Sequence, residues 1–292
     1  AISVVIVLVA LPQSAQAFLS WQEDDNSLEM RGLLRGSELV LKNPDNQFFY
    51  NRRSVYGLAA SGRLMVDAGF GESISFEMHA VQNYIPLDLQ TGGSNLITLR
   101  DVERSDLLDW SFDASRSHLL IDRLNIQYRS DKVSLKVGRQ PVNLAATFYF
   151  SPNDFFAPFA AQTCFRLYKA GVDAALADIQ IGEFSQLTII SVLGYAIDPV
   201  SDNGWSKRSS SARNAYLTRA STVVADFEIA LLVGSVKKDV VIGTDFQGEL
   251  FEWLGIRGEG HVNFPDQAGL KRSVEFSLGM EHRWENTLTL RA

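Results

Sequence analysis

Charged side chains recur at alternate positions inside apolar segments of this sequence, and that spacing determines the chemistry they can do. In the segment 274–283, Glu275, Glu281 and Arg283 alternate with large apolar residues. Successive side chains of a β-strand point to opposite faces, so the pattern predicts strands with one apolar and one charged face. Ten charged side chains are assigned to polar faces in this way: Arg63, Glu77, Arg123, Lys136, Lys169, Asp173, Arg257, Glu259, Glu281 and Arg283. Their mixed signs predict a transverse field without a strong preference for one sign of ion, and isolated ion pairs with no further role are the alternative.

The spacing of nucleophiles and metal ligands gives no indication of an enzyme. The four histidines, His79, His118, His261 and His282, do not have metal-ligand spacing with one another. The sequence contains neither a Gly-x-Ser-x-Gly nucleophile motif nor a phosphate-binding P-loop. A single cysteine, Cys164, allows no disulfide and no cysteine-based metal site within the chain. We therefore expect no catalytic residues, no cofactor and no bound metal.

Composition and charge exclude two broad classes of protein. The formal net charge of the 292 residues is −7, and no basic run is present, so nucleic acid is not an expected partner. The mean hydropathy of −0.02 is too low for a bundle of transmembrane helices. It does not exclude membrane-spanning strands, because their alternating apolar and polar residues average out.

The N-terminal segment predicts export from the cytoplasm. The apolar run Ile2 to Leu11 is followed by Pro12 and by the small-residue motif Ala15-Gln16-Ala17. This arrangement is typical of a secretory signal peptide, here over residues 1–17 with Phe18 as the first mature residue. Because a basic segment and an initiator methionine are missing, we expect the sequence to begin partway into the signal.

The elements that carry the charged residues predict an antiparallel β-barrel. Alternating segments of about ten to twelve residues match the length of membrane-spanning strands. Short turns at 69–72, 130–131, 182–183 and 225–226 interleave with long loops at 85–116, 145–163 and 198–211. Outer-membrane barrels have such short periplasmic turns and long extracellular loops. We therefore expect an all-β transmembrane barrel over residues 54–292, with residues 18–53 as a periplasmic lead-in or a first strand. About twelve strands are visible, the chain is expected to stop within a strand, and a complete barrel would have 14 to 18.

One stretch resembles a known group of proteins. A strand ends in Gly138-Arg139-Gln140-Pro141, and the loop that follows contains Ser151-Pro152-Asn153-Asp154 and Phe155-Phe156-Ala157-Pro158-Phe159. In this stretch the sequence is similar to bacterial outer-membrane porin-like barrels, including alginate-export-type barrels and the porins of porin–cytochrome conduits. The motif covers residues 135–173 only. The resemblance implies a barrel, the outer membrane and transport, and it indicates no particular substrate.

The loop 145–163 is the expected pore constriction. Its candidate residues are Phe150, Pro152, Asn153, Asp154 and Phe155. For Asp154, a role as a simple turn former is the alternative. Arg139 is an eleventh candidate for lining the pore, but it has the parity of Val137, which would direct it to the lipid headgroups. A bulge at Gly138 would instead turn it inward, and both orientations stay open.

The function expected from the sequence is passive or substrate-biased diffusion of small solutes through an outer-membrane porin. Three alternatives stay open: a barrel sheath threaded by a partner such as a multihaem cytochrome, a polysaccharide-export barrel, and a surface adhesin that transports nothing. The expected partners are outer-membrane lipids and small solutes, with a homo-oligomer as a further option.

Overall fold

The computed structural model describes residues 16–42, 54–84, 111–114, 117–158, 168–197, 205–251, 253–284 and 289–291. Apart from one turn of 3-10 helix at Ser211–Arg213, every regular element in these ranges is a β-strand, which confirms the all-β prediction. The described part of the chain contains no helix with the length and apolar character needed to cross a membrane. The signal peptide predicted over residues 1–17 lies almost wholly outside the described residues.

Fourteen strands follow one another in a single antiparallel sheet, in the order β1-β2-β3-β4-β6-β7-β8-β9-β12-β13-β14-β15-β16-β17. Nearly every strand therefore pairs with its neighbours in sequence. Among the described strands the order is linear, with β1 and β17 as its two ends. The expected number of about twelve was too low, because two strands, β1 (Gln16–Glu23) and β2 (Asn26–Lys42), occupy most of the region left as a lead-in or first strand.

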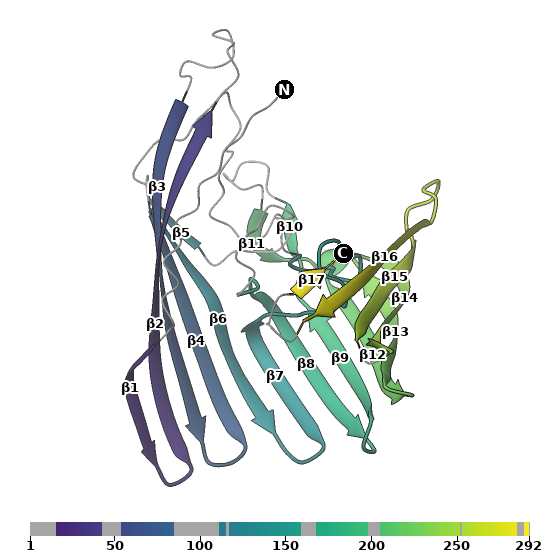
Figure 1. Cartoon of the computed structure of the whole chain (residues 1–292), viewed down its shortest axis with the longest axis horizontal. Coiled ribbons are helices and arrows are strands. Elements are labelled where there is room, and N and C mark those ends of the chain that lie inside the picture. The colour runs from purple at the N-terminus through teal and green to yellow at the C-terminus, as the bar shows by residue number, and fades with distance from the viewer. Residues whose placement is uncertain are drawn as a thin grey trace. The chain divides into compact units, whose positions relative to one another are not determined.

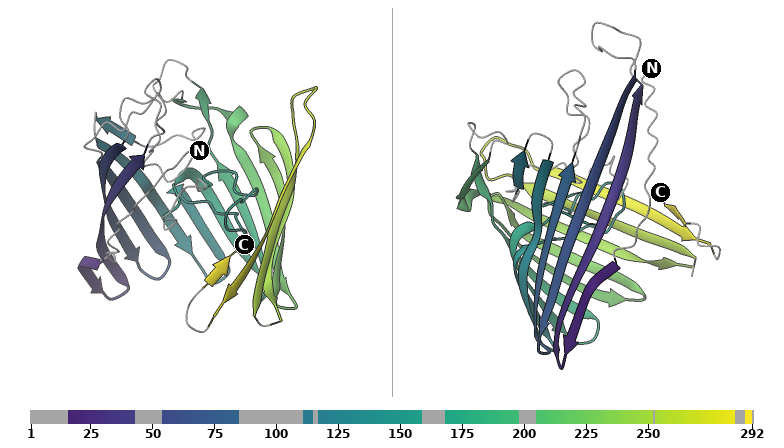
Figure 2. Two further views of the ribbon diagram at one scale, coloured as in Figure 1. Left: turned by 45° about the horizontal axis from the view of Figure 1, so that its top comes forward. Right: turned by 90° about the vertical axis from the view of Figure 1, so that its left-hand side faces the viewer.

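The chain divides into two compact units, and within β6 the division falls between Leu124 and Asn125. The first unit contains β1 and β2, followed by β3 (Ser54–Phe70), β4 (Ile74–Tyr84), β5 (Ser111–Ala114) and the beginning of β6 (Ser117–Arg129). The pairing of β2 with β3 extends to Lys42 opposite Ser54, whereas β4 pairs with β3 only as far as Ala60. Beyond the end of β4, strands β2 and β3 therefore continue as a long two-stranded twisted ribbon, drawn in purple and blue (Figure 2).

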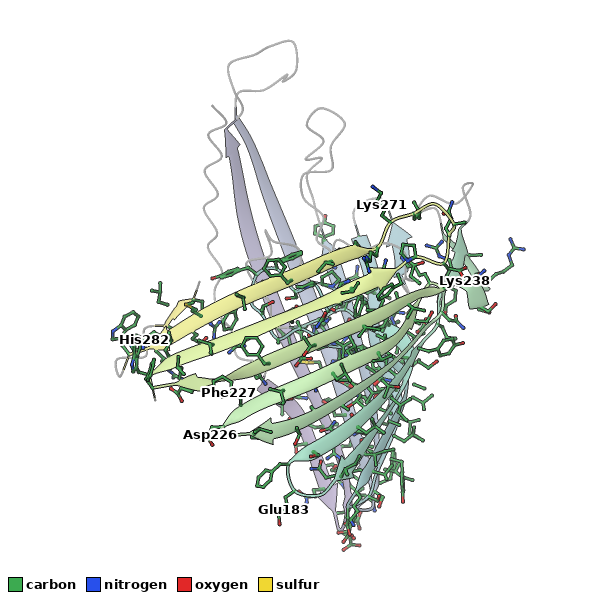
Figure 3. All side chains as sticks on the ribbon, turned by 90° about the vertical axis from the view of Figure 1, so that its right-hand side faces the viewer. Glu183, Asp226, Phe227, Lys238, Lys271 and His282 are labelled. Carbon is green, nitrogen blue, oxygen red and sulfur yellow. The ribbon has the colours of Figure 1, made fainter. Side chains whose placement is uncertain are left out.

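The second unit continues the sheet through the rest of the chain (Figure 1). After β6 come β7 (Val133–Gln140), β8 (Val172–Ile181), β9 (Ser185–Val192), β12 (Ala215–Val224), β13 (Phe227–Val236), β14 (Asp239–Leu250), β15 (Leu254–Phe264), β16 (Ser273–Arg283) and β17 (Thr289–Arg291). A separate pair, β10 (Tyr195–Ile197) with β11 (Trp205–Ser209), lies in the connection between β9 and β12. Glu183 and Asp226 lie at one end of the strands, and Lys238 and Lys271 at the other (Figure 3).

The predicted short turns are present within one or two residues of their expected positions. A two-residue turn joins β12 to β13 through Ala225 and Asp226, whose φ angles are 49° and 66°. A second turn of this kind, Lys237-Lys238 with φ angles of 54° and 75°, was not predicted. Two consecutive residues with positive φ match the right-handed twist of the strands they connect. The short connections thus fix the register of these hairpins.

The second unit has an exposed apolar face, which we call the outer face. On β16 it carries Val274, Phe276, Leu278 and Met280, and Phe276 is 73% exposed. On β13 it carries Ile229, Leu231 and Val233, while Ala230 and Leu232 between them are buried. On β15 the opposite, inner face carries polar side chains, such as Glu259 and His261. The alternation predicted for β15 and β16 is therefore confirmed.

The faces of β8 were predicted the wrong way round. Asp173 was expected on the polar face, which would place Val172 and Leu176, at the alternate positions, on the apolar outer face. Instead Leu176 is in register with Ile190 and Ala174 with Val192, so these apolar residues share the inner face. The reason is that a core forms there between the wall and the chain that follows β7: Val142, Leu144, Phe156, Ala157, Val172, Ala174, Ile190, Val192, Ala215, Leu217 and Leu232.

Candidate functional site: an inner-face loop and its cavity

The chain that leaves β7 folds back onto the inner face of the second unit. We call residues 141–158 the loop segment; it has no helix or strand of its own. Val142, Leu144 and Phe156 pack into the core described above. Burial of these side chains holds the loop segment against β8, β9 and β12. It contains all five candidate residues for a constriction.

Glu259 on β15 anchors the loop segment by its backbone. One carboxylate oxygen accepts the N–H groups of Thr147, at 3.2 Å, and of Ala146. The other oxygen accepts the N–H group of Asn153 at 3.4 Å. The side chain is only 4% exposed, so the carboxylate exchanges its hydration for these three donors. Glu259 was predicted to line a pore; the structure instead buries it beneath the loop segment.

Asn153 and Asp154 complete the attachment from the loop side. Asn153, with 0% of its surface exposed, donates its amide to the carbonyl of Thr244 at 3.1 Å, and its oxygen lies 3.3 Å from Nδ1 of His261. Asp154 lies 2.5 Å from the ammonium group of Lys169, which also donates to Asn143 at 3.1 Å. Burial lowers the pKa of Lys169 below the usual lysine value, although the neighbouring Asp154 opposes this shift. The two ends of the connection from β7 to β8 are therefore clamped together.

Aromatic residues of the loop segment contact cations and rings of the wall. The guanidinium of Arg257 lies 3.9 Å from the ring centroid of Phe148 and donates to the carbonyl of Ala146 at 3.1 Å. The ring of Phe155 meets that of His261 edge-on, with 4.9 Å between centroids. Of the other two candidates, Pro152 is buried and Phe150 is exposed. Such cation–π contacts supplement the anchoring by Glu259.

Arg139, for which two orientations were left open, is buried in an ion pair at the end of β7. Only 2% of its surface is exposed, and its guanidinium donates to Asp173 on β8 at 3.2 Å. Gly138 has a φ of 122°, and the register between β7 and β8 is unbroken at this position, so Arg139 keeps the parity of Val137 in that pairing. Asp173 also accepts the hydroxyl of Tyr195 at 2.8 Å. Burial, followed by the contact with Asp173, raises the pKa of Tyr195 above the usual tyrosine value.

A cavity of about 350 Å³ lies between the loop segment and the inner face. The loop side is formed by residues 141–146 and is free of charged side chains. The wall side is largely polar and comes from β8, β9, β12 and β14: Leu176, Asp178, Gln186, Thr188, Ile190, Arg219, Asp245 and Gln247. The cavity is therefore a polar space beside an ordered loop, which is an arrangement that can hold or pass a small hydrated solute.

Hydrogen bonds fix the polar side chains of this wall. Arg219 donates to both oxygens of Asp245, at 2.7 and 3.1 Å, and to Glu228 at 3.0 Å. Asp178 accepts Gln186 at 2.7 Å and Thr188 at 2.6 Å. The sequence pattern missed these residues. Arg219 lies in a segment whose two faces are similarly apolar, and Asp178 lies on a strand whose faces had been assigned in reverse.

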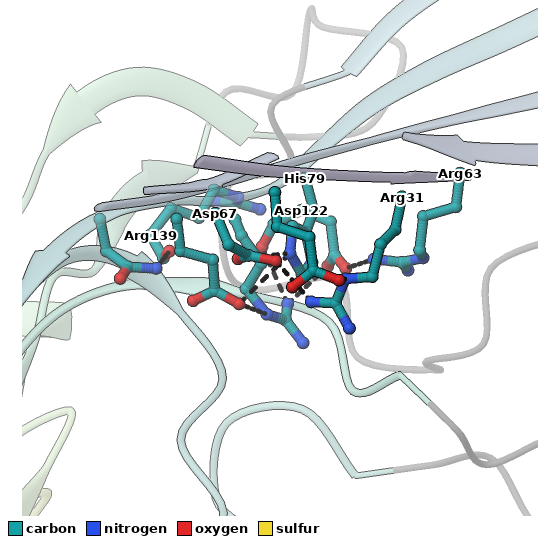
Figure 4. A network of polar contacts seen from close by, with 10 residues as sticks. Arg31, Arg63, Asp67, His79, Asp122 and Arg139 are labelled. Atoms are coloured by element: carbon teal, nitrogen blue, oxygen red, sulfur yellow. Dashed lines mark hydrogen bonds and ion pairs between the residues drawn. The ribbon is translucent and has the colours of Figure 1, made fainter. Parts of the chain in front are cut away.

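The first unit carries its own ionic network (Figure 4). Asp122 pairs with Arg63 at 2.5 Å and with Arg123 at 2.9 Å, and Asp67 pairs with Arg31 at 2.5 Å. Arg123 also lies 4.0 Å from Glu77, so three predicted residues, Arg63, Glu77 and Arg123, belong to one set of ion pairs. Asp122 was not predicted as a member of the polar face, because it alternates in step with the apolar residues Leu120 and Leu124.

Within that network, two carboxylates and a histidine approach one another closely enough to bind a metal ion. The ligand atoms of Asp67, Glu77 and His79 all lie within 4.8 Å of one another. Two adjacent strands bring them together, which is why spacing along the sequence did not reveal them. Arg31 already binds Asp67, however, and Arg123 lies 4.0 Å from Glu77. These cations occupy the carboxylates that a metal would need.

The remaining predicted residues lie apart from the cavity. Lys136 is half-buried on the inner face of β7, Glu281 pairs with Arg291 at 2.5 Å, and Arg283 is exposed. The structure therefore gathers the loop candidates and Glu259 into one site and leaves these three outside it. No protein-family model and no curated protein matches this chain.

Proposed function

We propose that this chain forms an outer-membrane porin: a β-barrel with a water-filled passage, narrowed by the loop segment, through which small polar solutes diffuse. One observation carries the proposal. A loop of the chain's own is fixed to the inner face by the buried carboxylate of Glu259, and a polar cavity remains beside it. Such a loop sets the width and lining of a passage.

The outer face supports a membrane location. Large apolar side chains recur along several strands, among them Leu231, Phe276 and Leu278. Soluble monomers rarely expose continuous apolar patches beyond a few hundred Å². In a bilayer these side chains would face hydrocarbon, while the opposite face remains hydrated. The orientation of the apolar residues is thus the one that a lipid environment stabilises.

The topology supports the barrel. Lipid offers no hydrogen bonds, so every backbone group of a membrane-spanning sheet needs a partner on the neighbouring strand. The antiparallel meander supplies such partners on both sides of each described strand between β1 and β17, and a barrel would form where these two edges are closed. The connections are short at one end of most strands, as in the turns at Gly182 and Asp226.

The loop segment also favours a porin over a sheath around a threaded protein. It covers the inner face of β8, β9 and β12, which is the surface that a threaded partner would contact. A sheath would need this surface to be free of its own chain. A polysaccharide exporter and an adhesin have no specific observation in their favour.

Reconstitution of the purified full-length protein into planar bilayers tests the proposal. We expect stepwise insertions with a stable open conductance, and heat-denatured protein as a control should give none. A protein that never conducts would overturn the proposal, as would one that conducts only after a bound partner has been stripped from it. The second outcome would establish the sheath.

A further inference from the structure

We infer that the cavity beside the loop segment selects cations, and that Asp178 is the residue that determines this selectivity. The inference rests on the proposed function and adds to it the class of solute: alkali-metal ions and small solutes that carry an ammonium group. It differs from the expectation drawn from the sequence, in which mixed charges gave no strong preference.

The first step of the argument is the position of Asp178. It lies on the inner face of β8 and lines the cavity opposite the uncharged residues 141–146. Its partners in register are Ser134 on β7 and Thr188 on β9, which are both neutral. A solute in the cavity would therefore meet this carboxylate without an intervening charge.

The second step is the state of the other charges in the wall. Among the described residues, Arg219 is the only cation that lines the cavity, and two carboxylates already neutralise it. Asp245 binds it through two hydrogen bonds and Glu228 through a third. Three of the five donors of the guanidinium thus face acidic partners of its own chain, which leaves it a weak attractor for anions.

The third step is the state of Asp178 itself. The carboxylate of Asp178 accepts hydrogen bonds from the amide of Gln186 and the hydroxyl of Thr188. Both bonds go to the same oxygen. Within the described residues, no lysine or arginine forms an ion pair with Asp178. Neutral donors stabilise a carboxylate without cancelling its charge. Asp178, Asp245 and Glu228 against Arg219 leave a net negative charge at the cavity.

A confined, partly desolvated space strengthens the effect of one uncancelled charge, because screening by water is weaker there. The mixed charges predicted from the sequence behave differently, since those on β15 are occupied in binding the loop segment. Among the charged side chains that line the cavity in the described part of the chain, Asp178 is thus the one without an oppositely charged partner.

Reversal potentials under a gradient of KCl test the inference on the full-length protein in planar bilayers. We expect the wild type to pass K⁺ more readily than Cl⁻. Asp178→Asn keeps the size and the acceptor oxygen for Thr188, and we expect it to lower the permeability ratio about fivefold. Asp178→Glu should retain most of the selectivity. Glu183→Gln, on the exposed turn after β8, is the matched control and should change nothing.

The outcomes separate this inference from the proposed function. Absence of any conductance in the wild type would refute the porin itself. An anion-selective or non-selective wild type would overturn the inference while leaving the porin in place. An unchanged permeability ratio in Asp178→Asn, with normal conductance and a heat-modifiable band that shows a folded barrel, would also overturn it.

Discussion

At the scale of single residues, one buried carboxylate fastens the loop segment to the inner face of the second unit. Glu259 accepts three backbone N–H groups from the loop segment, two on one carboxylate oxygen and one on the other. Buried donors that lose their acceptor are costly, at roughly 1–3 kcal/mol each. The loop segment should therefore respond strongly to changes at this position.

Glu259→Ala should release the loop segment from β15. We expect a larger and noisier single-channel conductance, together with new cleavage by protease between residues 141 and 158. Glu249→Ala, an exposed position on the neighbouring β14, is the control and should leave both properties unchanged. If the conductance and the cleavage pattern of Glu259→Ala equalled those of the wild type, the anchor would have no part in holding the loop.

Tyr195 gives a prediction about alkaline pH. Its pKa is raised above the usual value near 10, first by burial and then by its bond to Asp173. The folded protein therefore keeps this proton where the unfolded chain loses it. The resulting stabilisation is fully present below pH 10 and decreases as the pH rises further. In absorbance titrations at 295 nm, subtracting Tyr195→Phe from the wild type should reveal a phenol that ionises at a higher pH than an ordinary tyrosine. A difference spectrum that develops near the ordinary tyrosine value would contradict this.

At the scale of elements, the hairpins show how far local sequence determines structure. Alternation located β15 and β16 and assigned their faces correctly, because their apolar and polar residues separate cleanly. It failed at β8, where the inner face is apolar. The apolar partners of Val172 lie on the loop segment and on β9, β12 and β13, and periodicity within one strand carries no information about them. Glu259 illustrates the same limit, since its partners lie 106 to 113 residues away.

The turn between β12 and β13 offers a stabilising substitution. Ala225 and Asp226 both adopt positive φ, which is unfavourable for alanine by roughly 1–2 kcal/mol. Asn-Gly is the preferred pair for such a turn. Ala225→Asn with Asp226→Gly should raise the stability by about 1 kcal/mol. The measurement is the midpoint of heat-induced unfolding in detergent, read as a mobility shift on gels.

The same pair of residues placed elsewhere serves as the control for this substitution. Asn-Gly at Asp266-Gln267, in the connection before β16, replaces two exposed residues that do not have positive φ and should not stabilise the protein. Equal midpoints for the two variants would show that turn conformation is not the cause.

At the scale of the whole molecule, a membrane barrel predicts that a charged substitution destabilises the lipid-facing side of a strand more than its inner side. Leu278 is exposed on the outer face of β16, and Ser277 lies beside it on the inner face. A lysine on the lipid face of a barrel destabilises it by about 2–4 kcal/mol near the bilayer centre. Leu278→Lys should therefore lower the free energy of unfolding in lipid vesicles by an amount in this range, while Ser277→Lys should change it little.

Ser277→Lys is the matched control for Leu278→Lys, because the two positions are adjacent on β16 and differ in the face that they occupy. Equal effects in vesicles would argue that neither face contacts lipid. A protein that is stable in water without detergent, and for which Leu278→Lys is harmless, would exclude the membrane barrel altogether.

The attachment of the loop segment to β15 also has a consequence for the order of assembly. Each strand pairs with its neighbour in sequence, so hairpins form through local contacts and the wall grows strand by strand. Residues 141–158 leave the growing wall early, after β7, yet their acceptor Glu259 arrives only with β15. We expect a nascent wall that ends before β15 to be leaky. The passage would narrow late, in a single event, when the last third of the chain is in place.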